Sequence, residues 1–196
     1  MQQTTNMMIV GVGGQGTLLA SKLVGAVMLA RGLDVKVSEV HGMSQRGGSV
    51  VTYVRWGKAV ASPLIEHGEA DYMLAFELLE AARYLPYLKK GGQLVVNART
   101  IDPMPVITGA AVYPANLTDK LAAQSIDLIC CDAFDLAAQA GNAKAVNVVL
   151  IGVLARLMDI PAEQWKAAIQ ETVPARFLEI NQNAFDLGYH AVNGEG

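Results

Sequence analysis

The chain has 196 residues, of which 52% are hydrophobic and 17% are charged, and its formal net charge is -3. This length predicts one domain, and the weakly acidic balance without a basic run argues against a nucleic-acid-binding protein. A typical soluble domain carries about 25% charged residues. We therefore interpret the low charge as a sign that part of the surface is buried against a partner or a second copy.

The sequence favours a cytoplasmic protein without a membrane span. No stretch approaches the roughly 18 consecutive apolar residues of a spanning helix, and residues 1–6 lack the basic and apolar parts of a signal peptide. The two cysteines, Cys130 and Cys131, are adjacent in a predicted strand, where neighbours point to opposite faces. We expect no disulfide, and no zinc or iron–sulfur site, which needs about four ligands. We interpret both cysteines as buried apolar filler.

The first part of the chain has the pattern of a β-turn-α-β unit. An apolar strand at residues 7–12 leads through a glycine-rich turn into a helix at residues 15–31, and a second strand follows at residues 34–40. A third strand is expected at residues 49–56. Because the connection before it is short, this strand should run antiparallel to the second.

The remaining elements predict an α/β domain. We expect further strands at residues 71–76, 93–97, 110–113 and 126–131, an edge piece at 62–65, and helices at 78–88, 116–124, 133–140, 143–158, 161–171 and 174–189. The fold class is then a Rossmann-like, mostly parallel sheet with flanking helices, one antiparallel hairpin and a helical C-terminal region. Residues 1–196 should form one domain, with the sheet core in about residues 1–131 and the C-terminal helices of residues 132–196 packed on it.

The glycine-rich turn has the spacing of a phosphate-binding motif. It carries G-x-G-x-x-G at Gly11, Gly13 and Gly16. Such a turn presents backbone N–H groups at a helix N-terminus, which favours an anion. With Glu39 at the end of the second strand as a ribose ligand, it would predict a dinucleotide. However, Gly14 adds a fourth glycine and Gln15 a polar amide, and a tight turn that packs helix on strand explains the same glycines.

A second candidate segment runs from Ser38 to Gly48, between two predicted strands. Its last glycines let the backbone approach a ligand closely. Arg46 offers a planar, permanently charged donor fork for carboxylate or phosphate, and His41 can exchange a proton near neutral pH. A long hairpin loop in which Arg46 pairs with Glu39 would explain these residues without a ligand.

These segments should meet at one edge of the sheet, where the carboxyl ends of parallel strands lie and ligands bind. We expect that edge to carry residues 13–17, residues 39–46, Glu77 and Asn97. It combines anion-binding amides, an arginine, carboxylates and a histidine, but no nucleophile–base pair or cluster of metal ligands. We interpret it as half of a site that holds a charged ligand while another protein supplies the chemistry.

The chain resembles the gamma-type domain of the 2-oxoacid:ferredoxin oxidoreductases over nearly its whole length, and among them the small subunit of the indolepyruvate enzymes. The matching segments are residues 11–17, 38–48, 62–65, 69–71 and 75–77, together with Asn147, Gly152 and residues 181–188. The long segment at residues 38–48 is specific to this family, whereas the glycine turn by itself is not.

The resemblance implies a subunit, inactive alone, of an enzyme that oxidatively decarboxylates a 2-oxoacid with coenzyme A and passes electrons to ferredoxin. Thiamine diphosphate and iron–sulfur clusters would sit on a larger partner subunit and none on this chain, which leaves room for a homodimer of the isolated chain. The gamma-type domain would help to accommodate coenzyme A or substrate. On this sequence the lining role would fall to Gly13, Gln15, Gly16, Thr17, Glu39, His41, Gly42, Ser44, Gln45, Arg46 and Gly47. No catalytic residue or metal ligand is assigned.

Two alternatives stay open. A stand-alone Rossmann-type protein that binds NAD(P) or another nucleotide would need a glycine turn open to pyrophosphate and Glu39 free to meet a ribose. A scaffold subunit would use its glycines for packing alone. The segment from Ser38 to Gly48 argues against the dinucleotide, because such a site has no use for it.

Overall fold

The computed structural model describes residues 4–39 and 48–192. Its strands are β1 (Thr5–Val12), β2 (Asp34–Glu39), β3 (Ser49–Gly57), β4 (Ala70–Ala75), β5 (Leu88–Asn97) and β6 (Asp127–Cys131). Its helices are α1 (Thr17–Ala30), α2 (Leu78–Tyr84), α3 (Met104–Ile107), α4 (Leu117–Ala122), α5 (Ala133–Gln139), α6 (Val146–Leu157), α7 (Ala162–Thr172) and α8 (Leu178–Ala191). Short 3-10 turns lie at η2 (Leu85–Tyr87), η3 (Ala143–Ala145) and η4 (Ala175–Phe177).

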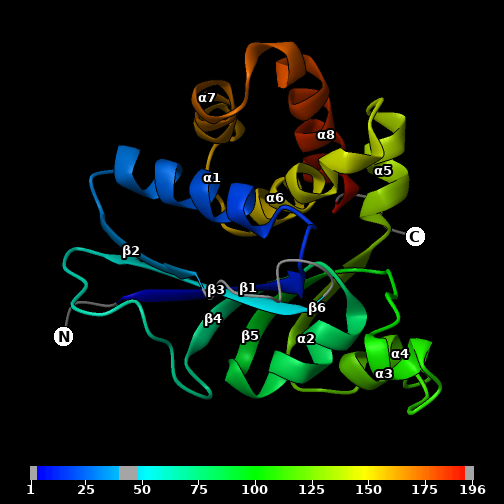
Figure 1. Ribbon diagram of the computed structural model, residues 1–196. Helices are drawn as coiled ribbons and strands as arrows, with labels where there is room; N and C mark the ends of the chain where they lie inside the picture. The colour runs from blue at the N-terminus through cyan, green and yellow to red at the C-terminus, as the bar shows by residue number, and fades with distance from the viewer. Residues whose placement is uncertain (1–3, 40–47, 193–196) are drawn as a thin grey trace.

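The strands form one six-stranded sheet in the order β2-β3-β1-β4-β5-β6, with helices on both faces (Figure 1). β1, β4, β5 and β6 run parallel, and the predicted antiparallel hairpin of β2 and β3 is confirmed. β3 also pairs antiparallel with β1. The two parallel strands of the β-turn-α-β unit are therefore separated by β3 and do not touch each other.

Both faces of β1 are buried, because neighbouring side chains alternate between two apolar clusters. Met7 and Ile9 pack with α1 and α6 on one face, whereas Met8 and Val10 pack with α2 and α4 on the other. The C-terminal helices α6, α7 and α8 belong to the first cluster. The α/β architecture with packed C-terminal helices is thus confirmed, while the assignment of residues 1–196 to one domain stays a prediction.

One predicted helix has the wrong end, and two predicted strands are wrong. The helix expected through residue 88 ends at Tyr84, and residues 88–97 belong to β5. Pro86 explains the end, because it has no N–H with which to continue the helical ladder. The strand expected at residues 110–113 and the edge piece at residues 62–65 are irregular. Each stretch has only four residues, too few for periodicity to identify a strand, and neither pairs with a strand of the sheet.

Helix α6 is buried along most of its length, and two glycines permit its closest contact with another helix. All residues from Asn147 to Ala155 are buried. A Cβ at Gly188 of α8 would lie 2.0 Å from the Val149 carbonyl oxygen, and one at Gly152 of α6 would lie 2.2 Å from the Phe185 carbonyl oxygen. The two backbones therefore touch directly, and neither position has room for a side chain.

We expect Gly188→Ala to lower the free energy of unfolding by about 3 kcal/mol or more, because the added methyl group must push α6 and α8 apart. Gly25→Ala is the matched control within a helix, since its Cβ would meet only the Val35 side chain, at 4.0 Å. That change should raise stability by about 0.5–1 kcal/mol. Urea unfolding of both variants measures the difference, and equal effects would contradict the close backbone contact.

Candidate functional site

The candidate site lies at the carboxyl ends of β1 and β4. In an open α/β sheet, a ligand binds where the connections from neighbouring parallel strands leave in opposite directions. Here the chain leaves β1 towards β2 on one side and leaves β4 towards β5 and β6 on the other. The residues directly beyond β1 and β4 therefore form the centre of the candidate site.

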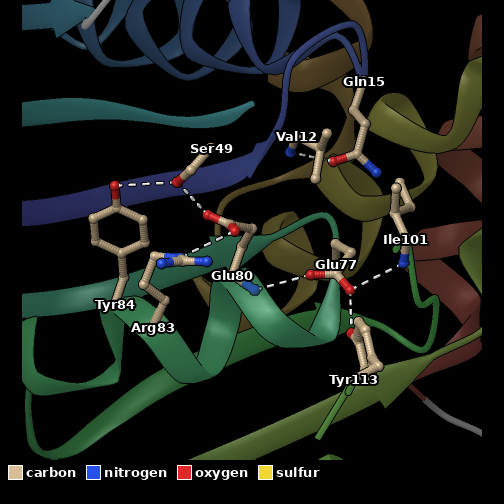
Figure 2. A network of polar contacts seen from close by, with 9 residues as sticks. All are labelled: Val12, Gln15, Ser49, Glu77, Glu80, Arg83, Tyr84, Ile101 and Tyr113. Carbon is tan, nitrogen blue, oxygen red and sulfur yellow. Dashed lines mark hydrogen bonds and ion pairs between the residues drawn. The ribbon is translucent and has the colours of Figure 1, made fainter. Parts of the chain in front are cut away.

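Gln15 ties the glycine turn to the end of β4. Its Oε1 accepts a hydrogen bond from the Val12 N–H at 2.7 Å (Figure 2), and its Nε2 donates to the Phe76 carbonyl at 3.1 Å. Gly11 provides the space, since a Cβ there would lie 2.8 Å from Gln15 Oε1. The side-chain amide of Gln15, which the sequence placed among the ligand-lining groups, is thus bonded within the protein.

Two glycines of the turn, Gly13 and Gly16, also make hydrogen bonds within the protein. Gly16 has φ 85° and precedes α1, and a Cβ at this position would lie 2.6 Å from Asn147 Nδ2. Asn147 Nδ2 donates to the Gly16 carbonyl at 3.3 Å. The Gly13 N–H donates to the Gly48 carbonyl at 2.8 Å. Close packing against α6 therefore requires glycine at position 16, independently of any ligand.

Glu39 is not placed as a dinucleotide site requires. Adjacent strands lie about 4.8 Å apart, and because β3 separates β2 from β1, Glu39 ends a strand two places away from the turn. The Ser21 hydroxyl donates to Glu39 Oε1 at 2.8 Å. Both residues line a groove of about 670 Å³ between α1 and β2. This geometry argues against the interpretation of the glycine turn and Glu39 as an NAD(P) site.

Glu77 lies at the predicted edge but is buried, with 1% of its surface exposed. Its carboxylate accepts from the N–H of Glu80 at 2.9 Å, from the N–H of Ile101 at 3.1 Å and from the Tyr113 hydroxyl (Figure 2). Burial, and then the Glu77 carboxylate, raise the pKa of Tyr113 well above its usual value, so the phenol stays a donor. Glu77 therefore fixes the chain after β5 through bonds within the protein.

Asn97, at the end of β5, also forms hydrogen bonds within the protein through its side chain. Its Nδ2 donates to the Phe76 carbonyl at 3.3 Å, and its Oδ1 accepts from the Ala133 N–H at 3.1 Å. The Phe76 carbonyl thus receives two side-chain amides, from Gln15 and from Asn97. These bonds join the carboxyl ends of β1, β4 and β5 and the start of α5.

Glu80 is a buried carboxylate that the sequence analysis missed. The Ser49 hydroxyl donates to its Oε2, and the Arg83 Nε donates to its Oε1 at 3.2 Å (Figure 2). Ser49 is the first residue of β3, so Glu80 fixes the chain where it enters the sheet. The sequence could not reveal this contact, because nothing in the helix pattern points to Ser49, which is 31 residues away in the chain.

Two cavities lie beside the junction of strand ends, by which we mean Gln15, Phe76 and Asn97 with their hydrogen bonds. A cleft of about 480 Å³ is lined by Gly14, Gln15, Gly16, Asn97, Arg99, Ile101, Phe134, Ala143, Lys144 and Val146. A smaller cavity of about 210 Å³ is lined by Val12, Gly48, Ser49, Glu77, Leu79, Glu80, Arg83, Ile101, Pro103, Met104 and Pro105. The structure thus brings the predicted glycine turn and Asn97 together, and adds Arg99, Phe134 and Lys144, which the sequence analysis did not select.

Six predicted lining residues lie outside the described residues, namely His41, Gly42, Ser44, Gln45, Arg46 and Gly47. Their lining roles stay predictions, as do those of Gly13, Gln15, Gly16, Thr17 and Glu39. In the described ranges 4–39 and 48–192, no group of three or more His, Cys, Asp or Glu side chains could hold a metal ion. Nor does this part of the chain contain a helix long and apolar enough to cross a membrane.

The interpretation of both cysteines as buried filler is wrong for Cys130, which is exposed, whereas Cys131 is partly buried and both are free thiols. They lie on β6, which is an edge strand of the sheet. Burial raises the pKa of Cys131 to about 12. Cys131 therefore stays a protonated thiol at neutral pH.

The sequence and the fold both match known proteins. Residues 6–191 match the family described as pyruvate ferredoxin/flavodoxin oxidoreductase. The chain is 45% identical over 191 residues to "Indolepyruvate oxidoreductase subunit IorB" of Thermococcus kodakarensis, with 95% of each chain covered.

Two solved structures have the same fold. One is the gamma subunit of the keto/oxoacid ferredoxin oxidoreductase of Geobacter sulfurreducens, with a TM-score of 0.70, 23% identity and 95% and 96% of the two chains covered. The other is the 2-oxoglutarate:ferredoxin oxidoreductase of Magnetococcus marinus, with a TM-score of 0.76 and 18% identity. That match covers 100% of this chain but 32% of the other, so the fold is one part of a longer chain there.

We expect Gln15→Glu to lower the free energy of unfolding by about 1–3 kcal/mol, because a carboxylate oxygen would replace the donor that faces the Phe76 carbonyl. Gln139→Glu makes the same chemical change at an exposed position at the end of α5, and should alter stability by less than about 0.5 kcal/mol. Urea unfolding at neutral pH compares the two. Equal stability of both variants would show that the Gln15 bridge does not hold the strand ends together.

Proposed function

Because the chain belongs to the pyruvate ferredoxin/flavodoxin oxidoreductase family, we propose that it is the subunit without iron–sulfur clusters of an indolepyruvate-type 2-oxoacid:ferredoxin oxidoreductase. The observation that carries this proposal is the 45% identity to an indolepyruvate oxidoreductase subunit across 95% of both chains. A match of that extent leaves no long segment of either chain unmatched. The fold, shared with a gamma subunit of a keto/oxoacid enzyme, agrees with it.

In the proposed reaction, a 2-oxoacid and coenzyme A yield carbon dioxide and an acyl-coenzyme A, and the electrons released reduce ferredoxin. Thiamine diphosphate, where it is bound, supplies the electron sink for loss of carbon dioxide. The chain has two cysteines, too few for the roughly four thiolate ligands of a cluster. We therefore assign thiamine diphosphate and the clusters to a larger partner subunit, to which an arylpyruvate such as indolepyruvate would bind.

The role proposed for this chain is to line one side of the active site, whose cofactors would be bound by the larger partner subunit. Gly13, Gly16 and Thr17 would line the ligand from the turn, and the segment containing His41 and Arg46 would line it from the connection between β2 and β3. Such residues hold and orient a charged substrate and exclude water, which favours transfer of the acyl group to coenzyme A over hydrolysis. Since the Gln15 amide is bonded to Val12 and Phe76, Gln15 would act by fixing the shape of the turn.

The partner interface would explain why so little of the chain is charged. An obligate interface buries more than about 2,000 Å² and is markedly apolar. In the Magnetococcus marinus enzyme this fold makes up 32% of a longer chain, which supports a separate large subunit here. We propose a cytoplasmic location, because the free thiols Cys130 and Cys131 suit a reducing compartment.

Purification of the tagged full-length chain from its native host, without oxygen, tests the proposal. We expect it to bring a larger, brown subunit with it, identified by mass spectrometry and by the visible absorption of iron–sulfur clusters. The complex should reduce ferredoxin or a dye in the presence of indolepyruvate, and this activity should depend on coenzyme A. A colourless protein that elutes alone and binds NAD(P) would contradict the proposal and support the dinucleotide alternative.

Turnover of the same complex with Arg46→Ala distinguishes a lining role of this chain from the scaffold alternative. Arg46→Lys is the conservative variant. If residues of this chain line the site, turnover should fall at least tenfold for alanine while the complex stays assembled. Full turnover of an assembled Arg46→Ala complex would favour a scaffold role for this segment.

A further inference from the structure

A loop at the carboxyl edge of the sheet exposes large apolar side chains to solvent. It comprises residues 101–113, between β5 and α4, and we call it the apolar loop. Met104 is 63% exposed, Ile107 65% and Val112 90%, and the one charged residue in this stretch of the sequence is Asp102. Apolar side chains scattered singly over a surface need no explanation, whereas a group of them on one short segment marks a contact with another molecule.

Both ends of the apolar loop are bonded to one buried carboxylate. Glu77 Oε1 accepts a hydrogen bond from the Ile101 N–H at 3.1 Å and another from the Tyr113 hydroxyl (Figure 2). Because Glu77 is buried, water competes little for these bonds. A surface loop whose ends are held together in this way has the form of an Ω-loop, a type of loop that frequently carries function.

Bonds within the apolar loop fix the course of its backbone. Met104 and Ile107 are three residues apart on helix α3, so they lie on the same face of that turn. The Ala111 N–H donates to the Pro105 carbonyl at 2.9 Å, which brings the segment that carries Val112 back to the helix. A loop that is ordered before binding loses less conformational entropy when a partner covers it.

The apolar loop lies against the candidate site. Pro103, Met104 and Pro105 line the cavity of about 210 Å³ together with Gly48 and Glu77. The proposed function assigns the cofactors to a larger partner subunit, and that subunit must reach this edge of the sheet for its cofactors to meet a ligand held here. A partner surface that covers the edge then also covers the loop. A second copy of this chain in the same place would block that approach.

We propose that the apolar loop is a docking element for the larger subunit, and that Met104, Ile107 and Val112 pack into an apolar surface of that subunit. The inference rests on the proposed function, which supplies the partner. Since the loop contains no Lys or Arg and a single carboxylate, the complementary surface is apolar rather than charged. Obligate interfaces resemble a protein interior, and charged residues are few in their core.

The test is competition for the larger subunit in the native host, which also makes the untagged wild-type chain. Tagged chains with Met104→Asp, Ile107→Asp or Val112→Asp, or with all three changes, are purified without oxygen. The larger subunit, identified by mass spectrometry and by its iron–sulfur absorption, is measured per tagged chain. Each single change should lower this ratio about tenfold relative to the tagged wild type, because it places a charge in an apolar contact. The triple variant should lower it further.

Two exposed leucines elsewhere are the matched controls, since Leu64 is 61% exposed and Leu29 is 59% exposed. Leu64 lies near the amino end of β1, because the Arg55 guanidinium bonds both its carbonyl and Asn6, and Leu29 lines the groove between α1 and β2. Leu64→Asp and Leu29→Asp should recover the larger subunit like the tagged wild type. Because every substituted side chain is exposed, all variants should stay folded, which urea unfolding of the isolated chains checks.

Three outcomes would contradict the inference. Recovery of the larger subunit by the loop variants at the wild-type level, or an equal loss in the two control variants, would overturn it while the proposed function stands. Self-association of the isolated chain that the loop variants abolish, with the larger subunit still bound, would assign the apolar loop to a second copy instead. A tagged wild-type chain that brings no larger subunit with it would overturn both the inference and the proposed function.

Discussion

The carbonyl of Phe76, directly beyond β4, is the acceptor on which the arrangement of the site depends. It receives the side-chain amides of Gln15 at 3.1 Å and of Asn97 at 3.3 Å. Each such bond contributes about 1 kcal/mol net, but a buried amide without its partner costs about 1–3 kcal/mol. These hydrogen bonds connect the carboxyl ends of the parallel strands β1, β4 and β5. Gly11 and Gly16 are required because Gln15 and Asn147 occupy the space that their side chains would fill.

This junction also separates two electrostatic environments. On one side, the carboxylates of Glu77 and Glu80 are buried and bonded to backbone N–H groups, hydroxyls and Arg83. On the other, Arg99 and Lys144 line a cleft without a carboxylate among its described lining residues. The charge of Glu80 is offset by Arg83, which pairs with it at 3.2 Å. This arrangement is compatible with the proposed role, in which the chain would hold an anionic substrate while a partner subunit would supply the redox chemistry.

The sequence predicted all six observed strands, although it also predicted a strand at residues 110–113 that is irregular. It predicted most helices and the sheet edge that carries the candidate residues as well, because apolar periodicity and glycine spacing are local signals. It also selected Gln15, Glu77 and Asn97 by their place at strand ends. Their bonding partners could not be predicted, since Phe76, Tyr113 and Ala133 come from other segments. The insertion of β3 between β1 and β2 is likewise a tertiary pairing that a β-turn-α-β pattern does not reveal.

Arg99 and Lys144 were missed for a related reason. They are 45 residues apart in the chain, each in an irregular or short element, and neither belongs to a recognisable motif. The stacking of Arg99 on Phe134 became visible only in the folded structure. By contrast, the segment from Ser38 to Gly48 was found readily from its composition, but most of it lies outside the described residues, so its contribution is argued from sequence and family alone.

Hydrogen–deuterium exchange of the complex, with and without coenzyme A, tests most directly whether this chain holds a substrate. If it does, the ligand should protect peptides that cover residues 13–17, 97–101 and 143–147. Peptides of the groove between α1 and β2, at residues 22–29 and 35–39, should exchange at the same rate in both states. Protection confined to the partner subunit, with no change in this chain, would contradict the account and leave the chain a scaffold.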